Sequence, residues 1–152
     1  MRTSRIAVIV VVALGMIVLA QEKKIQRADL PPAVEKTVAA QTQGATIKGF
    51  SQEKENGQTF YEAETTVNGH SKDITIDANG AVAEIEEQVA FDSLPAAVKA
   101  GLQAKAGDGK IVKVESLTKH DKLVAYEAKV QTAGKKKEIQ VGPDGRPLDH
   151  EE

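Results

Sequence analysis

The stretch Leu30-Pro31-Pro32-Ala33-Val34 decides the fold, because the chain repeats it 64 positions later as Leu94-Pro95-Ala96-Ala97-Val98. A second motif, Tyr61-Glu62-Ala63, returns 65 positions later as Tyr126-Glu127-Ala128. Three further positions match at that second shift: Ile74 with Ile139, Ile76 with Val141, and Gly80 with Gly145. A period this long with matched turns indicates a duplicated structural unit, and one inserted residue between helix and strands explains the change of shift.

Each copy of the first motif begins a short amphipathic helix. Proline suits the first turn of a helix, where the missing N–H costs nothing. Val34 and Val38 lie four positions apart, and Val98 and Leu102 repeat that spacing. Each pair forms an apolar stripe on a helix of about three turns.

After each helix the hydrophobic period changes to two. Apolar and polar residues alternate over 61–67 and again over 124–130. This alternation is typical of antiparallel strands with one buried and one hydrated face. Asn56-Gly57, Asn68-Gly69 and Asn79-Gly80 are strong hairpin signals, because both central positions of a tight turn need positive φ.

The sequence therefore predicts an α+β protein made of two tandem α-β4 repeats. Repeat 1 spans 28–89 and repeat 2 spans 90–152, after a signal peptide over 1–20 and a flexible lead-in over 21–27. A unit of about 60 residues is marginal alone, so we expect one shared antiparallel sheet of about eight strands, with the helices on one face.

Two details of this architecture can be checked directly. The fourth strand of the second repeat should follow Gly145 and lie at an edge, because Pro147 cannot donate a ladder hydrogen bond. Tyr61 and Tyr126 should occupy equivalent core positions under the two helices.

The first twenty residues have the three parts of a secretory signal peptide. Arg2 and Arg5 give a basic start, Ile6–Leu19 is an uncharged apolar run of 14 residues, and Val18-x-Ala20 places small residues before a cut at Gln21. The alternative is an uncleaved anchor, although a spanning helix needs about 20 apolar residues. We expect a periplasmic or secreted bacterial protein, cleaved near Ala20.

Composition narrows the class of partner. Removing the signal peptide leaves 132 residues with 18 basic and 22 acidic side chains, a balance unlike that of nucleic-acid-binding proteins. We expect membrane contact only through an uncleaved signal peptide. The chain has no Cys, so an exported fold must be held by its core alone.

Three segments resemble PepSY-like domains: the Leu-Pro-x-Ala-Val helix start, the Tyr-Glu-Ala strand, and the Ile-x-Ile-Asp77-Ala-Asn79-Gly80 turn. These are exported bacterial domains related to the propeptide modules of thermolysin-type proteases. Their tandem form is similar in fold to the β-lactamase inhibitory protein. The resemblance covers about residues 28–152 and implies a noncatalytic binding or inhibitory module. That inhibitor has disulfides and an aromatic-rich concave surface, whereas this chain has no Cys and no Trp, so we do not expect a β-lactamase target.

Motifs for catalysis, metals and cofactors are missing from the sequence. His70, His120 and His150 lack zinc-ligand spacing and are interpreted as solvated loop residues. Asp77-Ala78-Asn79-Gly80 begins like a calcium loop, but Val82 and Gln88 hold the positions of its Gly and Glu, which favours an Asx-type turn. We expect no enzyme activity, no catalytic residue, no metal and no cofactor.

Charge is divided unequally between the repeats. Residues 28–89 hold 4 basic and 11 acidic groups, whereas residues 90–152 hold 11 basic and 10 acidic groups. Strand alternation puts the acidic side chains of repeat 1 on the face opposite its apolar ones. The candidate binding face consists of Phe60, Glu62, Glu64, Asp73, Asp77, Glu84 and Glu86. The alternative is that these charges only keep that face hydrated.

These features predict an exported noncatalytic binding module, a protein or peptidase inhibitor acting through the open sheet face. Its partner would be an envelope protein or peptide with a basic patch, attracted by charge. A different class, a periplasmic small-ligand or cation-responsive sensor domain, stays open as the alternative.

Overall fold

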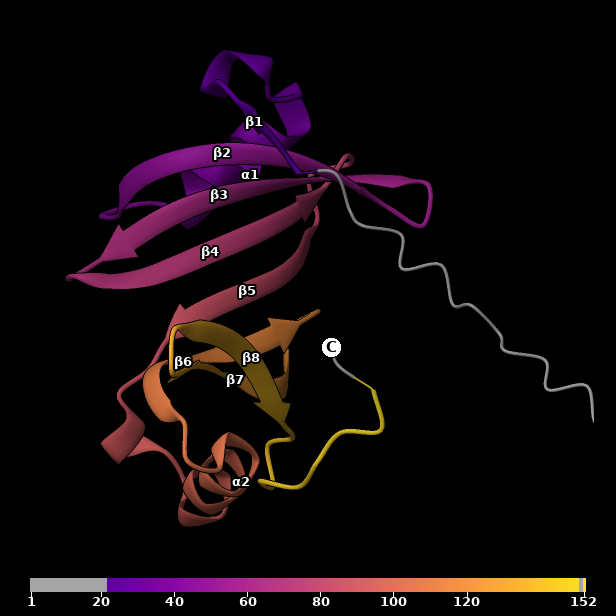
Figure 1. Ribbon diagram of the computed structural model, residues 1–152. Coiled ribbons are helices and arrows are strands. Elements are labelled where there is room, and N and C mark those ends of the chain that lie inside the picture. Colours follow the sequence, from indigo (N-terminus) through magenta and orange to yellow (C-terminus); the bar gives the residue numbers. More distant parts are fainter. Residues whose placement is uncertain (1–21, 151) are drawn as a thin grey trace, which may run out of the picture.

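The computed structural model describes residues 22–150 and residue 152 (Figure 1). The predicted signal peptide over 1–20 lies outside the described residues. Among the residues that are described, no helix has both the length and the apolar character needed to cross a membrane.

Eight strands form one antiparallel sheet, and their order in the sheet follows their order in the chain (Figure 1). The strands are β1 (Lys23–Ile25), β2 (Thr46–Glu55), β3 (Gln58–Val67), β4 (His70–Asp77), β5 (Val82–Gln88), β6 (Lys110–Lys119), β7 (Lys122–Thr132) and β8 (Lys135–Val141). The helices are α1 (Pro32–Gln41) and α2 (Ala96–Ala106), each preceded by one short 3₁₀ turn, η1 (Arg27–Asp29) or η2 (Phe91–Ser93). The predicted α+β class and the single eight-stranded sheet are confirmed.

Both helices cover the same face of this sheet. Cross-strand register aligns Phe50, Ala63, Ile74 and Ile85 in the first half, where α1 packs on the first three of them through Val34 and Val38. In the second half the buried row is Val114, Ala128 and Ile139, under Val98 and Leu102 of α2. Ile85 lies opposite Thr118, in the same alternation as Val114, so the two rows share one face. Each repeat thus has its own core cluster within one sheet.

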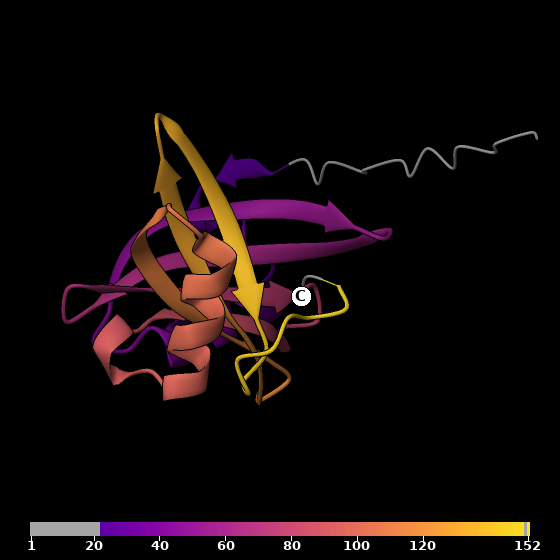
Figure 2. The ribbon, with the colours of Figure 1, turned by 60° about the horizontal axis from the view of Figure 1, so that its bottom comes forward.

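The sheet is strongly twisted, and the strands of the second half cross those of the first at a steep angle (Figure 2). The halves join where β5 pairs with β6. Near this junction Leu117 and Ala125 are buried although they point away from the helix-covered face. We attribute the burial of these two side chains to the twist of the sheet beside the junction.

The eight strands are distributed differently from the prediction. The lead-in over 21–27 is not a loose segment throughout, because Lys23–Ile25 forms β1 and pairs with Phe50–Gln52 of β2. Ile25 packs against the first core cluster, which explains why this short segment is held. The strand expected after Gly145 does not form; a turn closes there, with the Gly142 N–H donating to the Arg146 carbonyl at 2.8 Å.

The tyrosines occupy the predicted equivalent positions, at the margin of the cores rather than at their centres. Tyr61 is half-buried against the cluster under α1, and Tyr126 is half-buried against the cluster under α2. Smaller residues, Ala63 and Ala128, lie fully buried beside them. Small side chains at these centres let the helices lie close to the sheet.

A glycine turn meets the start of the helix in each repeat. Gly80 has φ +88°, and a Cβ added there would lie 2.7 Å from the carbonyl oxygen of Ala33 in α1. Gly145, at φ +79°, approaches Ala97 of α2 so closely that a Cβ would collide with its carbonyl group. The Thr37 hydroxyl also donates to the Gly80 carbonyl at 2.6 Å. The duplication therefore includes the contact that docks each helix.

We expect Gly145→Ala to destabilise the fold far more than Gly134→Ala. Both glycines have positive φ, +79° and +85°, so alanine costs about 1–2 kcal/mol at either site through backbone strain alone. Only at Gly145 does the added Cβ also collide with a helix, which adds about 1–3 kcal/mol. Urea denaturation of the two variants measures the difference, and equal losses would contradict the docking role of this turn.

Candidate binding face on the uncovered side of the sheet

The seven predicted binding residues do lie on one face, opposite the helices. Their cross-strand pairs show this: Phe60 with Asp77, Glu62 with Thr75 and Thr75 with Glu84, and Glu64 with Asp73 and Asp73 with Glu86. We call this side the open face. In the second half it continues with Lys113, Glu115, Lys119, Glu127 and Lys129.

A hollow of about 670 Å³ lies at one end of the open face, between the β2–β3 hairpin and the β4–β5 and β6–β7 turns. Five of the seven predicted residues line it: Phe60, Glu62, Asp77, Glu84 and Glu86. Glu64 and Asp73 share the face but lie outside the hollow. Glu53, Glu55, Lys119 and His120 complete its charged or titratable lining. The predicted residues therefore divide between this hollow and the adjoining sheet surface.

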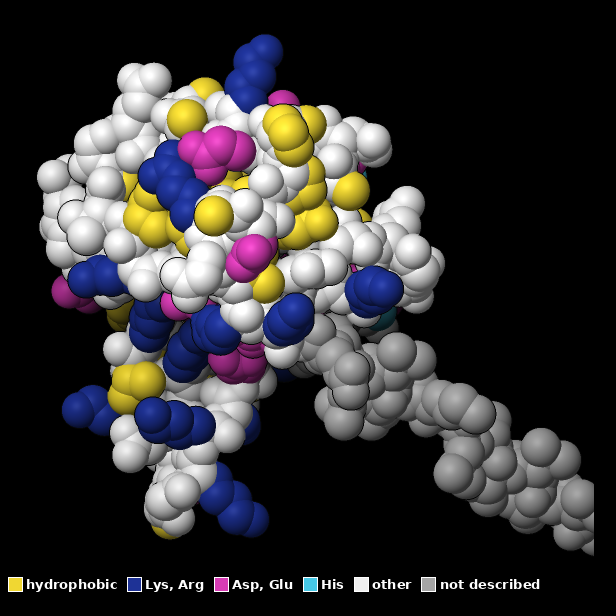
Figure 3. All heavy atoms as spheres, turned by 90° about the horizontal axis from the view of Figure 1, so that it is seen from above, with side chains coloured by type: hydrophobic (Ala, Val, Ile, Leu, Met, Phe, Trp, Pro, Cys, Tyr) yellow, Lys and Arg dark blue, Asp and Glu magenta, His cyan; other side chains and the backbone are white. Residues whose placement is uncertain are grey.

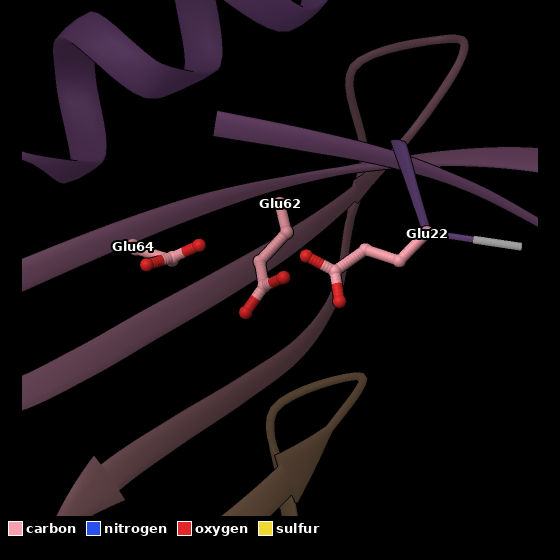
Figure 4. Close-up of side chains that lie close together, drawn as sticks. All are labelled: Glu22, Glu62 and Glu64. Atoms are coloured by element: carbon pink, nitrogen blue, oxygen red, sulfur yellow. The ribbon is translucent and has the colours of Figure 1, made fainter. Parts of the chain in front are cut away.

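The first group of close carboxylates sits beside β1. Glu22, which precedes β1, points its carboxylate toward Glu62 of β3, with Glu64 on the far side of Glu62 (Figure 4). Lys24 pairs with Glu22 at 3.0 Å and also with Glu64, and the hydrogen bond from Lys24 to Glu64 contributes most to raising the pKa of that lysine. The Ser51 hydroxyl donates to Glu62 at 2.9 Å. An ammonium group of the chain itself thus supplies positive charge to this group.

The second group lies at the centre of the open face and consists of Asp73, Glu86 and Glu115. Glu115 is 1% exposed, and its Oε1 lies 2.5 Å from the Lys113 ammonium. Its Oε2 accepts no hydrogen bond from the residues that the structure describes, although the Lys129 ammonium is 3.5 Å away. Two lysines therefore neutralise Glu115, and neither of them forms an ion pair with Glu86.

Burial on this face shifts several carboxyl groups in the same direction. Loss of hydration, with the nearby charges of Glu84 and Glu115, raises the pKa of Glu86 to about 8. Burial is also the main cause that raises the pKa of Glu62, Asp73 and Glu127. The open face therefore retains protons at pH values where surface carboxylates have lost theirs.

Asp77 has a structural role at the edge of the hollow. Its Oδ1 accepts backbone N–H groups of Asn79 at 2.8 Å and Ala81 at 2.9 Å, which is the geometry of an Asx turn. The interpretation of this motif as a turn is confirmed. That oxygen is already engaged, so of the predicted residues in the hollow, Glu62, Glu84 and Glu86 are the carboxylates better placed to contact a partner.

Sequence reasoning missed Lys24, Lys119 and the burial of Glu115 on the open face. Lys24 belongs to a strand too short to show a periodic pattern, and Lys119 reaches Glu84 at 3.4 Å from a strand 35 residues away in the chain. Glu115 could have been found, because it alternates with Val114 in a segment that reads as a strand. Its burial depends on the twist of the sheet, which alternation does not reveal.

The concentration of acid is local. Figure 3 looks down on the end of the molecule that carries β1, and there Lys and Arg side chains are spread among Asp, Glu and hydrophobic ones. No continuous acidic surface covers the described residues in that view. An acidic hollow is thus a property of the open face and is not repeated over this end.

Comparison with known proteins finds likeness in fold. No family model and no curated protein matches the chain. A BLIP-like protein from Bacteroides fragilis has a TM-score of 0.57 at 21% identity, over 78% of this chain and 83% of that one. A Bacteroides eggerthii protein described as periplasmic gives 0.64 at 18% identity, over 78% and 86%. A DUF2874 family protein from Bacteroides ovatus gives 0.62 at 18% identity, over 79% and 85%.

These structures support the expected similarity in fold to the β-lactamase inhibitory protein, for which BLIP is the usual abbreviation. At identities of 18–21% the likeness concerns the fold alone. None of these three proteins is described as PepSY-like, so membership of the PepSY-like family stays a prediction.

We expect Glu86→Gln to remove part of the pH dependence of stability. A carboxyl group whose pKa is about 8 in the folded chain binds more protons there than in the unfolded chain, so the free energy of unfolding falls as pH rises toward 8. At pH 9 the variant should be more stable than the parent by roughly 1–3 kcal/mol, and at pH 5 little different.

Urea denaturation at the two pH values measures this effect. Glu87→Gln is the matched control, because Glu87 is exposed on the same strand and points to the opposite face. A Glu86→Gln variant that is no more stable at pH 9 than the parent would contradict the burial of an ionised Glu86.

Proposed function

We propose that this chain is an exported, noncatalytic binding module that docks a protein or peptide with a basic patch on its open face. The observation that carries the proposal is the hollow, in which six carboxyl groups face one lysine. Such an excess attracts a cationic surface over a distance and favours it on contact. A partner covering this face would be inhibited by occlusion, without covalent chemistry.

Compartment and fold support the same proposal. The basic, apolar and small-residue segments at the start of the chain fit export, with cleavage near Ala20. Two of the structures similar in fold are described as a periplasmic protein and a BLIP-like protein. We infer a bacterial periplasmic or secreted location and a protein partner in the cell envelope.

A periplasmic sensor of cations or small ligands is the second candidate. Two groups of three carboxylates, each with oxygens within 4.8 Å of one another, favour it. Lys24 in one group, and Lys113 and Lys129 in the other, already supply positive charge there. The internal lysines weaken the case for a divalent cation, so protein docking ranks first.

We expect the triple variant Glu62→Gln, Glu64→Gln, Glu84→Gln to lose its partner, because it removes three negative charges from the open face. The measurement is crosslinked capture by the mature chain from native bacterial envelope, followed by identification of the dominant captured protein. The control makes an equal charge change outside the open face: Glu87→Gln, Asp92→Asn, Asp108→Asn. Equal capture by parent and triple variant would remove the docking proposal.

The sensor candidate makes a different prediction. A ligand that binds only the folded chain raises its melting temperature, and the stabilisation grows with the logarithm of one plus ligand concentration over Kd. For a protein-docking module, millimolar calcium chloride should leave the melting temperature unchanged. A clear rise that Asp73→Asn and Glu115→Gln abolish would favour the sensor instead.

A further inference from the structure

An aromatic side chain lies among carboxylates in the wall of the hollow. Cross-strand register places Phe60 directly between Glu53 on β2 and Asp77 on β4. The ring is half-buried, so part of it faces the hollow. Glu84 and Glu86 line the hollow from β5, where the register places them level with Glu62 and Glu64 of β3 rather than with Phe60. One apolar ring thus has a carboxylate on each neighbouring strand and shares the hollow with two more.

Positive charge in the hollow is scarce. The carboxyl groups of the lining are Glu53, Glu55, Glu62, Asp77, Glu84 and Glu86. Lys119 is the one lysine of the lining, and it is already shared between Glu84 at 3.4 Å and Glu152 at 3.7 Å. Glu86 has no lysine or arginine within ion-pair distance among the described residues. The hollow therefore lacks a counter-ion for Glu86.

Arginine has the side chain that fits such a site best. Its guanidinium is planar, stacks on an aromatic face and can bind two carboxylate oxygens at once. Calcium, by contrast, needs six to eight oxygens at about 2.3–2.6 Å. Within the hollow no three carboxylates form a close group, because Glu62 and Glu86 belong to different groups centred outside it. The spacing favours an extended organic cation over a metal ion.

We infer that the hollow takes one arginine side chain of the docked partner, which extends along the hollow from Phe60 toward Glu84 and Glu86. This inference rests on the proposed function and specifies its anchor. Under this inference, Phe60, Glu84 and Glu86 determine the specificity for the partner. Glu64 and Asp73 contribute negative charge from outside the hollow.

Arginine binding should be linked to a proton at Glu86. The groups that face Glu86 are Glu84 on β5, Asp73 on β4, Glu115 on β6 and Glu127 on β7, with Lys113 and Lys129 paired to Glu115. Near pH 7 Glu86 retains its proton, and a guanidinium must displace it. With a pKa of about 8, the ionised fraction of Glu86 rises about tenfold from pH 7 to pH 9. Affinity should rise by a similar factor, because arginine itself stays charged throughout.

The test uses N-acetylarginine amide as the probe and the ¹⁵N-labelled mature chain as the protein. Amide shifts should move in 58–62 and 82–86, with an affinity about tenfold higher at pH 9 than at pH 7. N-acetylcitrulline amide, which has the same shape without the charge, should cause no such shifts. Glu86→Gln should abolish the pH dependence, Phe60→Leu should weaken binding about fivefold, and Glu87→Gln should bind as the parent does.

The outcomes separate this inference from the proposed function. If arginine causes no shifts in the hollow while the open-face triple variant still loses its partner, the anchor is wrong and docking stands. If arginine binds as inferred while capture is unaffected by the triple variant, the hollow is an arginine site and the docking proposal fails. Equal amide shifts from N-acetylcitrulline amide, or from calcium chloride alone, would overturn the inference. The pH dependence of the parent's affinity for N-acetylarginine amide tests the inference without any variant.

Discussion

The close approach of each helix to a glycine turn is the constraint on which the arrangement depends. Gly80 holds the start of α1 and Gly145 holds the start of α2, and a Cβ at either glycine would meet helix backbone. Because both turns end strands of one sheet, both helices dock on the same face. The opposite face has no helix over it, although Glu152 contacts Gln140 and Lys119 there in the second half.

The twist of the sheet determines which side chains of this face are buried and which are exposed. Where β5 meets β6, side chains that alternation assigns to water are buried, and Glu115 is a charged example at 1% exposure. Carboxylates of repeat 1 meet lysines of repeat 2 there, as Glu84 meets Lys119. Because repeat 1 has more acidic side chains and repeat 2 more basic ones, opposite charges pair at the junction. An excess of acidic side chains remains in the hollow beyond it. The pairing needs both repeats, whereas the six carboxyl groups of the hollow all belong to repeat 1.

The features of the fold that could be predicted from the sequence are those that short-range periodicity determines. The duplicated motifs gave both helices and the shared sheet, and alternation in 61–67 correctly put Glu62 and Glu64 opposite the core. Periodicity could not predict β1, because three residues are too few to show a period and their pairing partners lie 25–29 residues away. Asp77 was assigned to the binding face by alternation, yet its carboxylate also closes a turn. Ion pairs between distant strands depend on register, which local patterns do not contain.

The two edge strands of the sheet affect self-association. An exposed edge strand is a template for pairing with a second copy, and proteins prevent such pairing with short edge strands or with lysines. One edge strand here is β1, only three residues long, and the other is β8, which begins with three exposed lysines at 135–137. Lys105 of α2 also donates to the Gln140 carbonyl of β8 at 2.9 Å. Edge-to-edge polymerisation is thereby disfavoured, so the chain can expose a broad helix-free sheet face without forming fibres.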